Sequence, residues 1–336
     1  MKKIVCALAL CILVLISTAF AETDYVNIVS LRTDAPERLQ GEYITQTGNT
    51  ISIDAPVIIP NVTTVPIVRV TWGGPMEIAD TSLKTIVNDT NTLQIDHGFT
   101  ADPSRILTDT FETVNAQLSH ADAAKTILNS VCSIIPALDP HDFECINSLS
   151  YRYGNGNGGF YMLFFARLYH GIPYLCNAPY AIPLDNAEPD IPYELTHGCI
   201  EDAEHYTVSV SSPQEIGLLE NDVPLLPFSE IEKIVSQRIE AGYVERLDEM
   251  RFGYRIFVDP DHSGSEYILV PVWVFAGSMR ASLDIPFVKE DVVFMPYKNM
   301  SSFAINAQTG EVYTFAFEKG QDRQLAPHIL KRNELQ

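Results

Sequence analysis

Residues 267–275 constrain the fold more strongly than any other segment, because nine consecutive residues there carry no charge. Side chains alternate between the two faces of a strand, and both the odd-numbered positions, which include Trp273, and the even-numbered positions are apolar. A strand that is apolar on both faces has to be covered on both sides, so we expect it to lie centrally in a sheet with Trp273 in the core. Residues 303–306 and 312–317, joined by a turn at Gly310, are expected to extend the same sheet.

The rest of the pattern predicts short strands and two helices rather than alternating βαβ units. One helix is expected to begin after Ser119, where Asp122 completes a capping box, and the other after Ser229, where Glu232 has the same role. The apolar stripe of the second helix, expected to face a sheet, consists of Ile231, Ile234, Val235 and Ile239. Further strands are predicted at residues 43–45, 51–53, 57–59, 67–70, 160–165, 171–175, 206–210 and 252–258. Meandering strands with few helices indicate the α+β class, with antiparallel sheets that carry helices packed on one face.

The N-terminus has the pattern of a secretory signal over residues 1–21. Two lysines precede an unbroken apolar run at residues 4–16, and small residues then lead to an expected cleavage between Ala21 and Glu22. The protein is therefore expected to be secreted or held in the extracytoplasmic cell envelope, with anchoring by an uncleaved signal as the alternative. No later stretch of the sequence is long and apolar enough to predict a transmembrane span.

The remainder of the chain is expected to form a leader, two lobes and a tail. Residues 22–40 have mixed charge and little periodicity, which is typical of a mobile leader. Prolines near residue 140 are expected to separate an N-terminal α+β lobe at residues 41–140 from a C-terminal α+β lobe at residues 141–320. Residues 321–336 are expected to be the tail.

The charge balance limits the partners. Asp and Glu number 43 against 22 Lys and Arg, so the formal net charge is −21. Phosphate backbones and anionic membranes attract clusters of Lys and Arg, so neither nucleic acid nor an acidic lipid surface is an expected partner. Hydrophobic residues make up 46% of the chain, which indicates a protein with a packed core.

Four cysteines remain after the signal, and an exported chain can pair them as disulfides. The least demanding arrangement joins Cys132 to Cys145 and Cys176 to Cys199, because both bridges close short loops. Buried thiols are the alternative. No two of these cysteines have the close C-x-x-C spacing of a metal site.

One segment has part of the spacing of a calcium loop. Asp259, Asp261 and Ser263, followed by Gly264, match its first, third, fifth and sixth positions, where alternate oxygens converge on one cation. The twelfth position, which should be a bidentate acid, is Val270. Asp, Ser and Gly are also ordinary turn residues, so a turn is the preferred interpretation and a calcium site the alternative.

No cofactor is expected from the remaining polar clusters. His197, Cys199, Glu201 and His205 lie close together in sequence, but their spacing matches no known zinc pattern and favours a solvated acidic loop. The glycine-rich residues 154–159 precede an aromatic strand and have no nearby lysine, so they favour a hairpin rather than a phosphate loop.

The sequence contains neither a G-x-S-x-G elbow nor an H-E-x-x-H helix, and no pair of acids stands out among 43. We therefore expect a protein that is not an enzyme and that binds, inhibits or modulates a partner. The alternatives are a hydrolase that acts on envelope polymers through paired carboxylates, and a structural surface component. Two facing acids with shifted pKa values would favour the hydrolase, and a large exposed apolar patch or a long unpaired edge strand would favour the structural component.

Several segments resemble an uncharacterised family of exported proteins from Gram-positive bacteria. They are residues 51–57, 65–70, 165–174, 212–216, 225–231, 269–275 and 305–312. The last two are also similar to PepSY-like domains and to the extracytoplasmic accessory regulators of a cell-wall sensor kinase. In those proteins a strand ending in tryptophan is followed by an Asn/Asp-Ala-x-Thr-Gly-Glu turn, which Trp273 and residues 306–311 match here.

The resemblance implies a PepSY-like C-terminal half and a role in binding, inhibition or signalling at the cell envelope, with an envelope protein or peptide as the partner. It supplies no catalytic residues to carry over. Members of the family are often lipoproteins, whereas this chain has no cysteine at the end of its apolar run.

Overall fold

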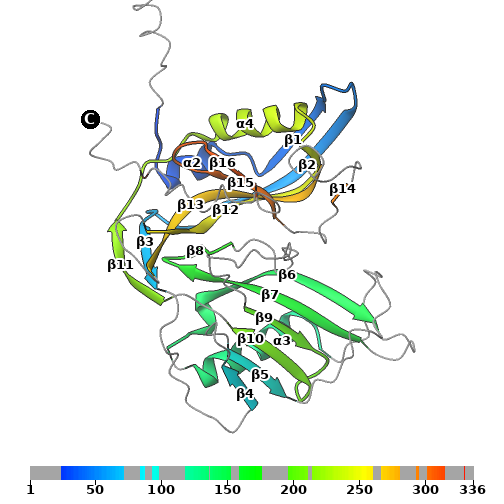
Figure 1. Cartoon of the computed structure of the whole chain (residues 1–336), viewed down its shortest axis with the longest axis vertical. Helices are drawn as coiled ribbons and strands as arrows, with labels where there is room; N and C mark the ends of the chain where they lie inside the picture. The colour runs from blue at the N-terminus through cyan, green and yellow to red at the C-terminus, as the bar shows by residue number, and fades with distance from the viewer. Residues whose placement is uncertain are drawn as a thin grey trace, which may run out of the picture.

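The residues that the structure describes form two β-sheets and three α-helices, a mixed arrangement of helices and strands in which strands predominate. Figure 1 shows the two sheets one above the other, and we call them the upper and the lower sheet. The computed structural model describes residues 24–71, 84–87, 93–97, 118–135, 137–152, 159–175, 196–210, 214–259, 266–280, 293–294, 301–314 and 329. The signal and its cleavage point therefore lie outside the described residues, as does the tail apart from residue 329.

The upper sheet has nine strands and is mixed. Its main path runs β1-β2-β12-β13-β15-β16, with β3 between β13 and β11, and β14 beside β13. The strands are β1 (Arg38–Ile44), β2 (Thr50–Ile58), β3 (Ile67–Thr71), β11 (Gln214–Glu220), β12 (Val244–Val258), β13 (Glu266–Arg280), β14 (Val293–Phe294), β15 (Ser301–Asn306) and β16 (Val312–Thr314). The strands predicted at residues 43–45 and 51–53 pair as the hairpin β1–β2, and those at 252–258 and 267–275 as β12–β13. The predicted pair at residues 303–306 and 312–317 is confirmed as the hairpin β15–β16.

The prediction of antiparallel sheets is wrong at one pairing of the upper sheet. Strands β2 and β12 pair in parallel, with Val57 opposite Met250. Parallel neighbours need a long crossover connection, and here that connection includes the whole lower sheet and α4. No local pattern in the sequence reports such a pairing.

The lower sheet has seven strands, and all its pairings are antiparallel. Its path runs β4-β5-β10-β9-β7-β6, with β8 beside β7. The strands are β4 (Lys84–Val87), β5 (Leu93–His97), β6 (Phe143–Arg152), β7 (Gly159–Tyr169), β8 (Ile172–Pro173), β9 (Thr196–Ile200) and β10 (Tyr206–Val210).

The two sheets divide the chain differently from the expected lobes. The upper sheet takes its strands from residues 38–71 and 214–314, and the lower sheet from residues 84–210. The lower sheet is thus inserted between β3 and β11. The boundary predicted near residue 140 falls between α3 and β6, which contact each other in the lower half, because the prolines there end a helix without ending a domain.

Helix α2 (Ile28–Asp34) lies within the segment predicted to be a mobile leader, so that prediction is wrong for these residues. The helix is capped by Asn27, whose side chain accepts a hydrogen bond from the backbone N–H of Ser30 at 2.9 Å. Its buried residues are Ile28 and Leu31. A helix this short buries one apolar pair, which is too little for a periodic pattern to be recognised.

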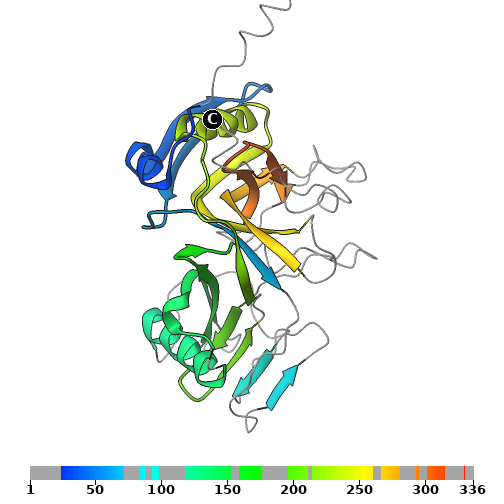
Figure 2. The same cartoon turned by 90° about the vertical axis from the view of Figure 1, so that its left-hand side faces the viewer.

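Helix α3 (His120–Ile134) packs on the lower sheet, as Figure 2 shows. The predicted cap is confirmed, because the Ser119 hydroxyl accepts from the backbone N–H of Asp122 at 3.2 Å. Gly198 on β9 permits the close approach, since a Cβ there would lie 2.7 Å from Ile127. A short 3-10 turn, η2 (Pro140–Asp142), follows the helix.

Helix α4 (Phe228–Glu240) covers the upper sheet (Figure 1). The predicted N-cap at Ser229 is wrong, because the helix begins two residues earlier than expected, with Pro227 as the cap and no side-chain cap bond. The predicted inward stripe is confirmed at Ile231, Val235 and Ile239, and Phe228 extends it; the predicted Ile234 is only partly buried.

Trp273 lies in the centre of the core, as predicted for β13. Its side chain is 0% exposed and meets the rings of Phe228 and Phe252 edge to face, at centroid distances of 5.7 and 5.4 Å. Because β13 pairs with β12, β3 and β15, this strand is central in the sheet. The core of the upper half is therefore built around it.

The two sheets meet at one edge of β12. The backbone N–H of Leu175 donates to the carbonyl of Tyr254 at 2.9 Å, which extends the edge of β12 with chain from the lower sheet. Arg251 on β12 pairs with Glu144 on β6 at 2.6 Å. Gly253 allows this contact, because a Cβ there would lie 2.6 Å from the carbonyl oxygen of Pro173. The two sheets therefore make direct contact at this point.

Candidate functional site

The turn that resembles the PepSY-like pattern connects β15 and β16. The side-chain oxygen of Asn306 accepts from the backbone N–H groups of Gln308 at 2.8 Å and Thr309 at 3.2 Å. Gly310 has φ of 75°, a conformation that glycine adopts at little cost. Asn306 and Gln308 are both fully buried, so these polar residues build the turn rather than face a ligand.

A buried arginine lies beside this turn. The Arg255 guanidinium lies over the rings of Phe257 and Tyr313, at 5.3 and 4.9 Å from their centroids. The Tyr313 hydroxyl accepts from the side-chain amide of Asn306 at 3.1 Å and donates to Glu311 at 3.0 Å. Burial raises the pKa of Tyr313, which keeps this phenol neutral. These contacts hold the β15–β16 hairpin against β12, and no pattern in the sequence predicts them.

Asp259 is the one described member of the calcium candidate. Its carboxylate is 1% exposed and accepts from Nε of Arg69 at 2.8 Å. Asp261 and Ser263 lie outside the described residues. A guanidinium at this distance already neutralises the carboxylate, so Asp259 serves to join β3 to the end of β12.

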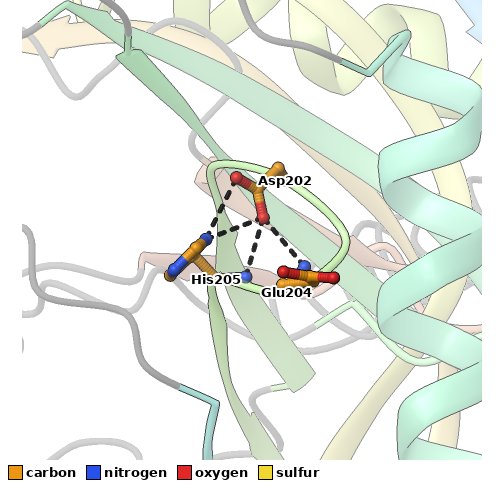
Figure 3. A network of polar contacts seen from close by, with 3 residues as sticks. All are labelled: Asp202, Glu204 and His205. Carbon is orange, nitrogen blue, oxygen red and sulfur yellow. Dashed lines mark hydrogen bonds and ion pairs between the residues drawn. The ribbon is translucent and has the colours of Figure 1, made fainter.

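The loop between β9 and β10 contains part of the zinc candidate. Figure 3 shows that Asp202, which the sequence did not single out, organises it: its carboxylate accepts from the backbone N–H groups of Glu204 and His205 and from Nδ1 of His205, at 2.8 to 2.9 Å. Aspartate commonly accepts from backbone amides two or three residues later in a turn, so the position of Asp202 in the sequence is a signal for this turn. His205 is exposed, whereas Cys199 is buried in β9. Within the described residues, no group of three or more His, Cys, Asp or Glu side chains could hold a metal ion.

Titration of His205 tests this geometry. Hydrogen bonds, first from the N–H of Glu204, lower the pKa of Asp202, and the Asp202 carboxylate in turn raises the pKa of His205. We expect the imidazole resonances of His205 to titrate with a midpoint pH above that of an ordinary histidine. The imidazole is therefore charged at pH values below this raised midpoint. Asp202→Asn keeps the acceptor oxygen for the two backbone amides but removes the charge, so the midpoint should fall. An unchanged midpoint in this variant would contradict the assigned pairing.

The described cysteines Cys132, Cys145 and Cys199 carry thiols, so the predicted Cys132–Cys145 disulfide is absent from the structure. Cys176, the expected partner of Cys199, lies outside the described residues. Burial raises the pKa of Cys132 to about 11 and that of Cys199 to about 12, which makes both poor nucleophiles near neutral pH.

Alkylation checks the state of these cysteines. Without reductant, we expect iodoacetamide to modify Cys132 and Cys199 slowly in the native protein, because so little thiolate is present, and rapidly in denaturant. Mass spectrometry of the peptides gives the extent of labelling at each cysteine. Peptides that remain unlabelled in denaturant until a reductant is added would show that these residues are disulfide-bonded instead.

Exposed apolar side chains mark a different part of the upper sheet. On β11, Ile216 is 48% and Leu218 is 41% exposed, and both lie between Glu215 and Glu220. Figure 1 shows β11 at the outer edge of the upper sheet, and among the described strands it pairs with β3 alone. We call Glu215, Ile216, Leu218 and Glu220 the β11 patch.

Comparisons with known proteins give a structural likeness only. No protein-family model matches the chain, and no curated protein matches its sequence. The fold is similar to the crystal structure, at 1.45 Å resolution, of an uncharacterized protein from Eubacterium rectale ATCC 33656, with a TM-score of 0.52 and 12% identity. The match covers 85% of this chain and 97% of that one. The similarity therefore supports a shared fold with an uncharacterised protein of a Gram-positive bacterium, and it assigns no function.

Proposed function

We propose that this protein is an exported, non-enzymatic binding protein that inhibits or modulates an envelope protein or peptide. The observation that carries the proposal is the β11 patch, where two large aliphatic side chains are exposed on an edge strand. Large exposed apolar side chains that are adjacent to each other are typical of interaction surfaces. Strands β12, β13 and β15 of the same sheet bury their large apolar side chains, whereas Ile44 on β1 is exposed without a second exposed aliphatic residue two positions away.

Several carboxylates of the described residues are engaged in the structure itself, which supports a structural rather than a catalytic role for them. The carboxylates of Asp54, Glu144, Asp248 and Asp259 each accept from an arginine. A general acid needs a raised pKa, whereas the pKa values of Asp54 and Asp202 are both lowered, by bonds from Arg38 and from the N–H of Glu204 respectively. These groups hold strands and turns in place.

Location in the envelope is part of the proposal. It is supported by the signal-like residues 1–21 and by the likeness of residues 306–311 to the turn of PepSY-like regulators. In the part of the chain that the structure describes, helices are too short or too polar to cross a bilayer.

Affinity capture tests the proposal. Immobilised mature protein, incubated with a detergent extract of the producing cell's envelope and crosslinked, should retain a specific protein or peptide. Free mature protein added in excess should displace it. Purified cell wall incubated with the same protein should release no soluble fragments. Fragment release that increases with time and protein concentration would contradict the proposal and favour the hydrolase.

A further inference from the structure

We infer that the β11 patch is the docking surface for a partner segment that combines aliphatic residues with lysine or arginine. This inference rests on the proposed binding function and names the site and the chemistry of its partner.

The space beside Gly217 on β11 is open within the described residues. Ile216 and Leu218 flank Gly217, and no heavy atom other than its chain neighbours lies within 4 Å of a Cβ built on this glycine. One edge of β11 is paired with β3, and in this pairing Leu218 lies opposite the buried Val68. Packing within the protein therefore uses one edge of the strand and leaves the side chains of Ile216 and Leu218 accessible to a partner.

The backbone of β11 disfavours pairing with a second copy. The register to β3 shifts between Glu215 and Gly217 and again between Leu218 and Glu220, so the strand is bulged twice. Bulges interrupt the regular row of backbone donors and acceptors that edge-to-edge assembly needs. Two copies would also bring together two chains with a formal charge of −21 each. Contact through side chains of a different protein fits this geometry better.

The charge around the patch selects a basic partner. Glu215 and Glu220 lie at either side of the apolar pair, and Asp222 follows the strand. His170 contacts Glu215, with Nε2 at 3.1 Å from the carboxylate. A lysine or arginine next to an aliphatic residue can place its charge near Glu215 or Glu220 while the aliphatic side chain covers Ile216 or Leu218.

A charge-matched pair of variants tests the inference. The probe is a short fluorescent peptide of alternating leucine and lysine, titrated with mature protein and followed by anisotropy. Ile216→Asp should weaken binding by about tenfold, because it removes one large aliphatic contact. Ile44→Asp, on β1 at 69% exposure, adds the same charge at a distant edge and should leave binding unchanged. A peptide of leucine and glutamate should not bind.

Equal affinity of Ile216→Asp and wild type, equal losses in both variants, or no binding of the leucine–lysine peptide to wild type would each overturn the inference. Self-association of wild type that Ile216→Asp abolishes, measured by sedimentation, would also overturn it by assigning the patch to a second copy. Circular dichroism checks that both variants remain folded.

Affinity capture separates failure of the docking surface from failure of the proposed function. If Ile216→Asp still captures the envelope partner, the assigned docking surface is wrong while the binding function stands. If wild type captures nothing, the proposed function itself fails.

Discussion

Replacing Trp273 with alanine is expected to lower the free energy of unfolding by about 3–5 kcal/mol, the usual range for removing a buried aromatic side chain. Trp273 is fully buried between β12, α4 and β15, and its neighbours Phe228 and Phe252 are held by their own backbones. They cannot close the space that the indole leaves, so the cost of a cavity adds to the lost burial.

Chemical denaturation followed by circular dichroism measures this loss. Val29→Ala on α2 is the control, because Val29 is partly exposed and its truncation should cost no more than about 0.5 kcal/mol. A loss for Trp273→Ala as small as that for the control would contradict the central position of β13.

Arg69→Met should cost about 3 kcal/mol, because it leaves the carboxylate of Asp259 in the protein interior without its guanidinium. Methionine keeps much of the aliphatic length of arginine, so the change mainly removes the charge. The effect arises from Asp259, which is nearly inaccessible to water, whereas Arg69 itself is partly exposed.

Arg38→Met is the matched control for this change. Arg38 pairs with Asp54 through the same Nε–carboxylate contact, at 2.6 Å, but both side chains are largely exposed. Exposed pairs contribute about 0–1 kcal/mol, so this variant should be nearly as stable as wild type. Similar small losses in both variants would contradict the structural role of Asp259. Calcium that stabilised wild type but not Asp259→Asn would instead support the calcium site.

The local elements were largely readable from the sequence. The central position of the strand at residues 267–275 is predicted by its two apolar faces. The cap at Ser119 is predicted by the spacing of Ser119 and Asp122. The turn at Gly310 follows from the glycine itself. Each of these features depends on residues close together in the chain.

The features that the sequence did not reveal depend on distant contacts. The parallel pairing of β2 with β12 and the insertion of the lower sheet between β3 and β11 join segments far apart in sequence. Asp259 has the residue type and spacing of a metal ligand, and its partner Arg69 is recognised only in three dimensions.

The β11 patch was hidden for a similar reason. Ile216 and Leu218 have the composition of an ordinary half-buried strand, and their exposure follows from the position of β11 at the sheet edge. The resemblance of residues 212–216 to the family concerns residue types alone and does not indicate which side chains face solvent.

Hydrogen–deuterium exchange of the mature protein, with and without the leucine–lysine peptide, locates the surface that the peptide covers. Bound peptide should cover one segment of the upper sheet and slow exchange of its backbone amides. We expect slower exchange at residues 214–220 and unchanged exchange at residues 38–44 of the other edge strand. Unchanged exchange at residues 214–220 under saturating peptide, or protection confined to another strand, would contradict the assigned docking surface.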